Sequence, residues 1–385
     1  KCGNAIVGYV KEEDIGGVPN EAFKAVENDK KEVVKGLKKL NTKEIKANKN
    51  QNHMHFGSYE KEDAVEKFRK KWHNISIMPE TTIEEIQAKK EAFIQFSTGE
   101  TYQKYKLIAS IPIAQFYAEK TSETKDKLIT THEFQGYWDG LNTLPKEKED
   151  FVKQIIEEQK LFHWFLEFPE VMQNGGFDCI LGNPPYLGKR KISGTMGYYF
   201  CNYAKWKFAP TGLNELAAYF LRRIFTLIKN AGLFGLITTN SVKDGAVRED
   251  GLGQVIEQGG EIIMAVRSIR WPGIANLYVS LLSVFKGEWN GHKILDNHKV
   301  PTITSFYEDF KDMGTANKLH ENNNYLFNGT YFLGDGFLLS EEKALRIINE
   351  EPISRNVIFK SLNGAEVNNF PSQKPQRYII NFFDW

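Results

Sequence analysis

The sequence has few of the features that mark membrane, disulfide-rich or zinc-binding proteins. No stretch of its 385 residues approaches the eighteen consecutive apolar residues that a membrane span needs. Its three cysteines are far apart, which argues against a zinc site or a disulfide framework and fits a reducing, cytoplasmic setting. The formal net charge is only +1, so no global basic field indicates a nucleic-acid partner, although a large enzyme can still carry a local basic groove.

The first residues also lack an initiator Met, a secretion signal and a transit-peptide pattern. Hydrophobic residues make up 41% of the chain and charged residues 26%, which is an ordinary globular balance. The length favours two or three domains. We therefore expect a globular, multidomain protein whose sequence here is one part of something larger.

Changes of composition divide the chain into four segments. Residues 1–19 hold a short apolar run that ends in a Gly- and Pro-rich break, and residues 20–160 are rich in Lys and Glu with helical character. Residues 161–290 alternate apolar runs with helical periodicity, and residues 291–385 are mostly looped apart from a periodic helix over 340–350. The close pair His53 and His55 lacks acidic or cysteine neighbours, so we expect a surface loop there and no metal site.

The third segment predicts part of an α/β sheet. Apolar residues recur at three- and four-residue steps over 213–228, which is typical of one helix face, and this helix is expected to stop at a left-handed Gly232. Short apolar runs around this helix predict buried strands at Phe177–Gly182, Leu233–Thr239, Glu261–Val266 and Leu277–Phe285.

A local excess of lysine lies in the helical segment. Residues 30–49 contain eight Lys and two Glu. Lys35, Lys38 and Lys39 are candidates for contacts to a DNA backbone, because lysines that neutralise phosphates release counterions on binding. A solvated helix face is the simpler alternative for the same pattern.

The sharpest motif is Asn183-Pro184-Pro185-Tyr186, directly after the first strand of the predicted sheet. Two consecutive prolines exclude both helix and ladder pairing, so the chain leaves the sheet as a stiff loop. In open α/β sheets, ligands bind at the carboxyl ends of the strands. A Pro-Pro turn capped by Asn is the purely structural alternative, but the strand before the motif and the helix and strand after it favour a functional loop.

Such a loop suits methylation of an exocyclic amine. The lone pair of adenine N6 is delocalised into the ring, so this amine is a poor nucleophile. The Asn183 side-chain oxygen and the Pro184 carbonyl could each accept one N6 hydrogen bond, which would localise the lone pair for attack on a sulfonium methyl group. Tyr186 would stack on the target base after it is rotated out of the duplex, and stacking contributes about 1–3 kcal/mol per base.

At this point the chain resembles the class I S-adenosylmethionine-dependent N6-adenine DNA methyltransferases, whose catalytic motif is Asn-Pro-Pro-Tyr. The resemblance implies that all four residues of the motif are catalytic. It also implies that Gly3 and Asn4 approach the cofactor adenine, that Asn214 begins the helix lining the methionine end, and that Trp271 is a second aromatic against the flipped base.

Within that family, the chain resembles more specifically the large type IIG and IIL restriction–modification methyltransferases and related phage-defence enzymes. This resemblance implies the C-terminal part of a Rossmann-like class I methyltransferase sheet, with residues 1–19 ending the cofactor-binding half and 20–160 forming a helical insertion. Residues 161–290 would be the catalytic core, and 291–385 a linker and the start of a target recognition domain. S-adenosylmethionine and double-stranded DNA are the implied cofactor and partner.

The chain departs from this family in one respect. The Gly-rich turn that cradles the methionine is absent, so we expect an upstream segment, in the same or a split chain, to complete the cofactor site. Protein glutamine N5-methyltransferases share the motif but are usually small, cytosine N4 enzymes more often begin it with Ser or Asp, and a non-catalytic DNA-binding or assembly subunit is a further alternative.

Overall fold

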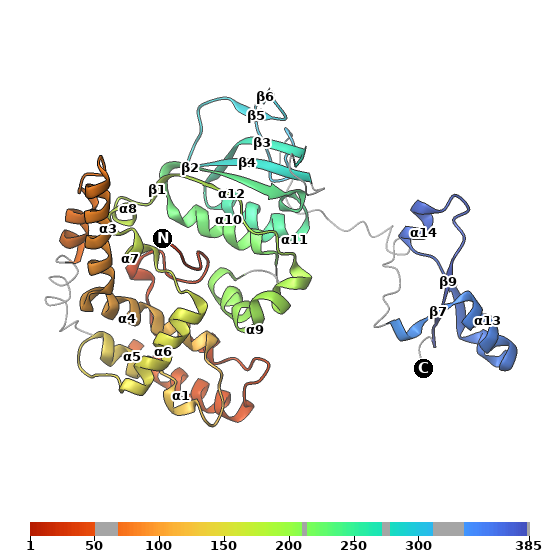
Figure 1. Ribbon diagram of the computed structural model, residues 1–385, viewed down its shortest axis with the longest axis horizontal. Coiled ribbons are helices and arrows are strands. Elements are labelled where there is room, and N and C mark those ends of the chain that lie inside the picture. The colour runs from red at the N-terminus through yellow and green to blue at the C-terminus, as the bar shows by residue number, and fades with distance from the viewer. Residues whose placement is uncertain (51–67, 210–213, 272–277, 311–334, 383–385) are drawn as a thin grey trace. The chain divides into compact units, whose positions relative to one another are not determined.

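The computed structural model describes residues 1–50, 68–209, 214–271, 278–310 and 335–382 (Figure 1). The chain forms two compact units, Lys1–Asp312 and Met313–Trp385. The first contains a six-stranded sheet and a helical layer, and the second contains a small sheet with helices of its own. Among the described helices, none is long and apolar enough to cross a membrane.

The six-stranded sheet has the strand order β1-β2-β4-β3-β5-β6. β1 and β2 are parallel, whereas β4 is antiparallel to both β2 and β3. The strands β1, β2 and β3 therefore run in one direction and end at the same edge, which we call the carboxyl edge. The strands are β1 (Phe177–Gly182), β2 (Ile228–Thr239), β3 (Gly260–Arg270), β4 (Tyr278–Lys286), β5 (Lys293–Leu295) and β6 (His298–Val300).

Helices connect and cover these strands. Between β1 and β2 lie α9 (Lys189–Phe208) and α10 (Leu216–Leu227), and between β2 and β3 lie η4 (Asn240–Lys243), α11 (Gly245–Val247), η5 (Arg248–Gly253) and α12 (Gln254–Glu257). The predicted strands and the helix over this region are confirmed, and so is the α/β fold. Apolar side chains of α10 pack on the sheet with those of the strands, among them Leu221, Ile224, Phe225, Phe234, Leu236, Ile262, Leu282 and Val284.

Two details of the sequence prediction are wrong. β1 is not buried: Leu181 is 78% exposed, because β1 pairs only with β2 among the described strands and forms the edge of the sheet. The helix α10 ends at Leu227, and it is Ala231, with φ of 61°, that takes the left-handed conformation. The role of Gly232 is instead to let the backbone of β2 approach the backbone of β1 closely. A Cβ at this position would lie about 3 Å from the carbonyl oxygens of Lys229, Phe177 and Asp178.

The helical layer occupies most of residues 12–173, so the helical character predicted for residues 20–160 is confirmed where these residues are described. Its central helix is α4, which is buried along most of its length from Leu107 onwards. A capping box formed by Thr82 and Glu85 begins α3. The elements are η1 (Glu12–Asp14), η2 (Asn20–Phe23), α1 (Lys31–Asn50), a helix over 68–76, α3 (Ile83–Thr98), α4 (Glu100–Tyr117), η3 (Lys125–Lys127), α5 (Thr131–Trp138), α6 (Lys146–Gln159), α7 (Trp164–Glu167) and α8 (Pro169–Gln173).

The start of the chain joins this layer to the sheet. Residues 4–9 run beside residues 160–164: the Phe162 amide donates to the Val7 carbonyl at 3.0 Å, and the Trp164 amide donates to the Tyr9 carbonyl at 2.9 Å. Val7 and Tyr9 are buried. The segment that the sequence assigns to the cofactor side is therefore held next to the chain that leads into β1.

The second unit contains an antiparallel sheet of order β7-β9-β8 and the predicted helix over 340–350. The Ser340 side chain caps this helix by accepting from the Lys343 amide at 3.3 Å. A small core includes Leu339, Ala344, Ile348, Ile358 and Tyr378. The elements are η7 (Asp335–Phe337), β7 (Leu338–Ser340), α13 (Glu341–Glu350), η8 (Pro352–Asn356), β8 (Ile358–Ser361), α14 (Gly364–Asn369) and β9 (Arg377–Ile380).

Candidate active site

The loop that follows β1 is fastened to β2 through a tyrosine. The Tyr186 hydroxyl donates to the Asn183 side-chain oxygen at 2.5 Å and to the Ile237 carbonyl at 3.3 Å. Pro184 is buried, whereas Tyr186 is 38% exposed and Asn183 faces solvent. Partial burial raises the pKa of Tyr186, so this hydroxyl is a donor at neutral pH.

The start of α10 is attached to the same loop. The Leu216 amide donates to the Leu187 carbonyl at 3.1 Å. The adjacent Glu215 carboxylate accepts from the Ser241 hydroxyl at 2.9 Å, and Ser241 lies just beyond β2. The sequence analysis missed Glu215 and Ser241. A polar residue directly before a predicted helix, such as Glu215, and one directly after a predicted strand, such as Ser241, are signals that could have found them. These contacts join the ends of β1 and β2 at the carboxyl edge.

Asn214 is buried and all its described side-chain contacts are internal. Its Nδ2 donates to the Ala246 carbonyl and to the Asp250 carboxylate, both at 2.8 Å. Its Oδ1 accepts from the Glu215 amide at 3.0 Å. The side chain thus fixes the approach to α10, and a contact to a cofactor remains a prediction.

Gly3 and Asn4 lie beside the chain that leads to β1. The Asn4 amide donates to the Lys160 carbonyl at 2.8 Å, and the Asn4 side-chain oxygen accepts from the Ile6 amide at 3.2 Å. A Cβ on Gly3 would overlap the ring of Phe162 at 2.2 Å, so glycine allows the two segments to approach. Their predicted role toward the cofactor is not tested by these contacts.

A cavity of about 460 Å³ lies between β1, the loop and α10. Its lining includes Asn183, Pro184 and Pro185 from the loop, and Ala5 from the start of the chain. Apolar side chains form most of the rest, namely Trp164, Phe177, Ile180, Leu181, Phe220, Ile224, Leu227 and Leu236. The fold therefore brings Ala5, which follows the predicted cofactor residues Gly3 and Asn4, to the same cavity as Asn183, Pro184 and Pro185.

A buried arginine faces this cavity from α10. Arg223 is only 2% exposed, and its Nη2 donates to the carbonyls of Ile6 at 2.6 Å and Gly8 at 3.0 Å. Its Nε has no hydrogen-bond partner among the described residues. Burial lowers the pKa of Arg223. Arg223 connects α10 to residues 6–8, and no sequence pattern marks it, because its partners are backbone atoms more than two hundred residues away.

Trp271 lies at the carboxyl edge but away from Tyr186. It follows β3, which is separated from β1 by three strand spacings, about 14 Å. It is half-buried, and no ring contact links it to Tyr186 in the described part of the chain. The rest of its predicted loop, Pro272 and Gly273, lies outside the described residues.

The candidate phosphate-binding lysines lie elsewhere. Lys35, Lys38 and Lys39 are exposed on α1. Figure 1 shows α1 at the far side of the helical layer from the sheet. The structure therefore does not bring these lysines to the loop.

Two further cations lie next to the loop and were missed by the sequence analysis. Arg190 and Lys191 are exposed at the start of α9, within five residues of Tyr186. The three consecutive basic residues that follow the motif are a signal that could have found them. No cluster of His, Cys, Asp and Glu suited to a metal occurs among the described residues, and His53 and His55 lie outside them.

The family comparison identifies the class of this chain. A profile of the Eco57I restriction-modification methylases matches residues 23–249. The match covers more than half of the chain and includes the loop, α9, α10 and the parallel strand pair. The chain belongs to the Eco57I restriction-modification methylase family.

Three solved structures match parts of the chain at low sequence identity. The type IIL restriction-modification enzyme MmeI, solved with DNA, is 19% identical with a TM-score of 0.44, over 61% of this chain and 35% of MmeI. A chain described as a type I modification subunit from Vibrio vulnificus YJ016 is 14% identical with a TM-score of 0.22, over 54% of this chain and 51% of that one. A chain described as a class I S-adenosylmethionine-dependent methyltransferase from Listeria monocytogenes is 10% identical with a TM-score of 0.23, over 58% and 80%.

The protein spans about a third of the length of MmeI, since 35% of that chain is matched. The comparison with curated proteins gives no match.

Proposed function

We propose that the chain is the catalytic part of a site-specific DNA adenine-N6 methyltransferase in a cytoplasmic restriction–modification or phage-defence system. The observation that carries this proposal is the Asn183–Tyr186 loop at the carboxyl end of β1, beside the parallel strand β2, in a chain of the restriction-modification methylase family. An amide oxygen, a proline carbonyl and an aromatic ring at this edge match the needs of a flipped adenine.

The roles of the loop residues follow from their chemistry. The Asn183 oxygen and the Pro184 carbonyl accept the two N6 hydrogens, which draws the nitrogen toward tetrahedral geometry. Tyr186 leaves the Asn183 oxygen and stacks on the base, and Trp271 closes the opposite side. S-adenosylmethionine supplies, when bound, a methyl group on a positively charged sulfur. As the new N–C bond forms and the S–C bond breaks, the N6 proton becomes acidic and passes to water.

The cavity beside Asn183 fits the methyl-transfer end of that cofactor. This cavity is mainly apolar, and its one unpaired buried donor among the described residues is the Nε of Arg223. Gly3 and Asn4 would contribute near the cofactor adenine, and Asn214 would act through the start of α10. Groups for the ribose hydroxyls and for the rest of the methionine remain to be supplied.

We assign those groups to a preceding polypeptide segment that pairs with β1. The outer edge of β1 has no strand partner in the described part of the chain, and its Leu181 is largely exposed. An unpaired edge with an exposed apolar side chain is a template for strand addition. A parallel strand there would place its own carboxyl end next to Asn183, where a Gly-rich turn could hold the methionine.

The test is methyl transfer from labelled S-adenosylmethionine to unmethylated DNA, with and without the preceding segment, read as digested nucleosides. N6-methyladenine that appears only with the segment would support both parts of the proposal. Label in glutamine of an added protein, or no transfer in either case, would reject a DNA methyltransferase.

We expect Tyr186→Ala to weaken binding to DNA with the target adenine more than binding to DNA with an abasic site at that position. The reason is that only the first DNA offers a base for the ring to stack on, at about 1–3 kcal/mol. Fluorescence anisotropy with the two duplexes measures the difference. Tyr198→Ala, which removes another exposed tyrosine, is the control. Equal losses on both duplexes would contradict stacking.

For DNA binding, the structure favours Arg190 and Lys191 over the α1 lysines because they lie beside the loop. In the double variant Arg190→Gln and Lys191→Gln, we expect the fall of log affinity with log salt concentration to become less steep by roughly 2. Each phosphate that is no longer neutralised contributes nearly 0.9, or roughly one unit, to that slope. The same measurement on the variant with Lys35, Lys38 and Lys39 changed to Gln tests whether DNA also reaches α1.

Lys104→Gln with Lys125→Gln removes two other exposed cations and serves as the control. An unchanged slope in the Arg190 and Lys191 variant would show that DNA does not pass over the start of α9.

A further inference from the structure

The helix that leaves the catalytic loop is divided into two parts. α9 begins at Lys189, directly after the loop, but Gly197 within it is not helical, with φ of 81° and ψ of 161°. Such a conformation is open to glycine and strained for other residues. Residues 198–208 pack firmly into the helical layer, where Phe200, Tyr203 and Ala204 are buried. In the first part Ile192 is buried in the same core, so the first part links the second part to the loop.

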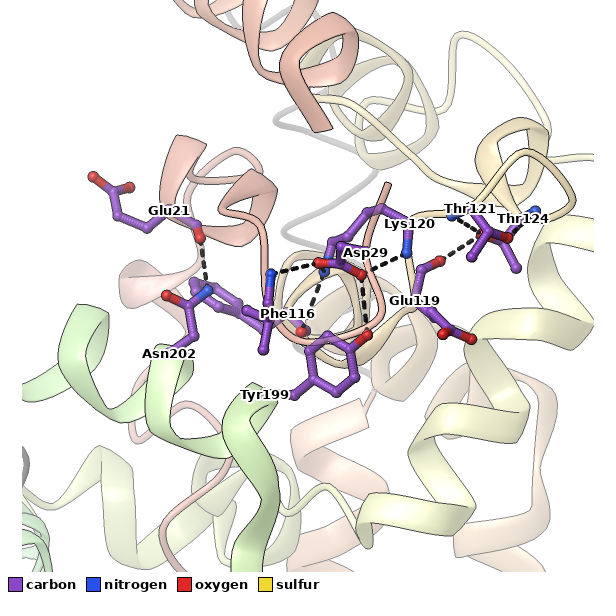
Figure 2. Close-up of polar contacts among 10 residues, drawn as sticks. Glu21, Asp29, Phe116, Glu119, Lys120, Thr121, Thr124, Tyr199 and Asn202 are labelled. Carbon is purple, nitrogen blue, oxygen red and sulfur yellow. Dashed lines mark hydrogen bonds and ion pairs between the residues drawn. The ribbon is translucent and has the colours of Figure 1, made fainter. Parts of the chain in front are cut away.

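A buried charge cluster holds this second part. The side chains of Asp29 and Lys120 are fully buried, with Lys120 Nζ 3.9 Å from Asp29 Oδ2. The Tyr199 hydroxyl donates to Asp29 Oδ1 at 3.0 Å, and the Lys120 amide donates to the same oxygen at 2.9 Å. The Val26 amide donates to Asp29 Oδ2 at 3.0 Å. Figure 2 shows the contacts of Lys120 and Tyr199 converging on Asp29. We call these three residues, Asp29, Lys120 and Tyr199, the Asp29 cluster.

The cluster joins three segments that are distant in the sequence. Asp29 comes from the turn before α1, Lys120 from beyond the end of α4, and Tyr199 from α9. Lys120 Nζ also donates to the Phe116 carbonyl at 3.4 Å and lies 5.1 Å from the centre of the Tyr199 ring.

Burial of these charges is costly, and apolar residues of the same size would pack here without that cost. Burial lowers the pKa of Lys120 to about 8, against the opposing attraction of Asp29. Burial also raises the pKa of Tyr199, and the carboxylates of Asp29, Glu119 and Glu27 act in the same direction. Tyr199 is thereby kept as a donor to Asp29. What the buried charges provide is a defined geometry between α9 and the helical layer.

Two neighbouring side chains, Asn202 and Tyr203, also attach α9 to other segments of the chain. The Asn202 side-chain nitrogen donates to the Glu21 carbonyl at 2.9 Å, as Figure 2 also shows. The Tyr203 hydroxyl donates to the Ile6 carbonyl at 3.3 Å and accepts from the Gly8 amide at 3.2 Å. Three polar side chains of α9 are therefore attached to the helical layer and to the start of the chain.

We propose that Asp29 and Tyr199 are positioning residues for methyl transfer: through their hydrogen bond, the helical layer sets where α9 begins and so where the Asn183–Tyr186 loop lies. This inference rests on the proposed function of that loop. It gives the helical insertion a role in catalysis, although Asp29 and Lys120 lie on other elements than the Asn183–Tyr186 loop. A misplacement of the reacting groups by about 1 Å costs up to about a hundredfold in rate.

The test compares Tyr199→Phe with Tyr198→Phe. Each change removes one hydroxyl from adjacent residues of α9, but only Tyr199 reaches Asp29, while Tyr198 is 51% exposed. In Tyr199→Phe we expect single-turnover methyl transfer to fall about tenfold with DNA affinity unchanged, since the hydroxyl positions the loop and touches no ligand. Amide exchange across residues 183–196 of the 385-residue chain should rise several-fold, and exchange in α4 should stay as it is. Tyr198→Phe should leave all four quantities unchanged.

Asp29→Asn is the second variant. It keeps the shape and the Oδ1 acceptor, but its Nδ2 cannot accept from the Val26 amide and the buried Lys120 loses its counter-charge, so it should show at least as large a change in the same direction. Faster exchange with an unchanged transfer rate would overturn the positioning role and leave the cluster a packing feature. Unchanged exchange in Tyr199→Phe would overturn the proposal outright. All transfer rates are measured with the preceding segment added. If the wild-type protein transfers no methyl group even then, the proposed function fails by itself, while the exchange comparison still decides whether Asp29 orders the loop.

Discussion

Asn183→Ala is expected to reduce methyl transfer at least about a hundredfold while leaving DNA affinity nearly unchanged. The amide oxygen holds the N6 hydrogens most strongly as the nitrogen becomes tetrahedral, so its contribution is made mainly in the transition state. Loss of a single hydrogen-bonding group that acts on developing charge lowers kcat by roughly 10²–10³ in known cases. Single-turnover transfer and equilibrium binding, measured on the same DNA, separate the two effects.

The variant should keep its fold, because Asn183 faces solvent and its only described side-chain partner is the Tyr186 hydroxyl. Asn174→Ala removes another exposed Asn, at the end of α8, and is the matched control with no expected effect on transfer. If DNA affinity falls as far as the transfer rate, Asn183 binds the base in the ground state and the proposed role is wrong. If transfer is retained, the loop is not catalytic.

The strands and the helix around the loop could be predicted because their signals are local. Four apolar runs and one three- and four-residue periodicity fall on β1 to β4 and α10, with bounds that differ by a few residues. The exposure of β1 could not be predicted in this way. A run such as Phe177–Gly182 is typical of a buried strand, but burial depends on which strands lie on both sides, and Leu181 has a described neighbour on one side only.

The candidate site shows the same division between local and distant information. Adjacent residues predict the loop itself, and a run of three basic residues indicates the start of α9. The contacts that hold the loop in place join residues far apart in the chain, such as Glu215 with Ser241, Arg223 with Ile6, and Tyr199 with Asp29. A single sequence has no pattern for such pairs, because each partner on its own is an ordinary residue and some take part only through a backbone atom.

A buried histidine makes the stability of the first unit sensitive to acid. His163 is 1% exposed, its Nδ1 accepts from the Tyr9 amide at 3.3 Å, and its Nε2 is 2.9 Å from the Ser110 hydroxyl. Since Nδ1 accepts, Nε2 carries the proton and donates to Ser110, so the imidazole is used in its neutral form. Burial lowers the pKa of His163 to about 3, and the charges of Lys106 and Arg223 act in the same direction.

The unfolded chain binds a proton at His163 near the ordinary pKa of 6.5, whereas the folded protein does so only near 3. Between these values the unfolded state holds more protons, so the free energy of unfolding falls as the pH falls, by about 1.4 kcal/mol per pH unit. We expect a loss of about 2 kcal/mol between pH 7 and pH 5, seen by urea unfolding followed through tryptophan fluorescence. His163→Gln should remove that part of the pH dependence, whereas His292→Gln, at an exposed position, should keep it. An equal pH dependence in His163→Gln and in the wild type would mean that His163 can be protonated in the folded state, and that the contact between residues 4–9 and 160–164 does not depend on a neutral imidazole.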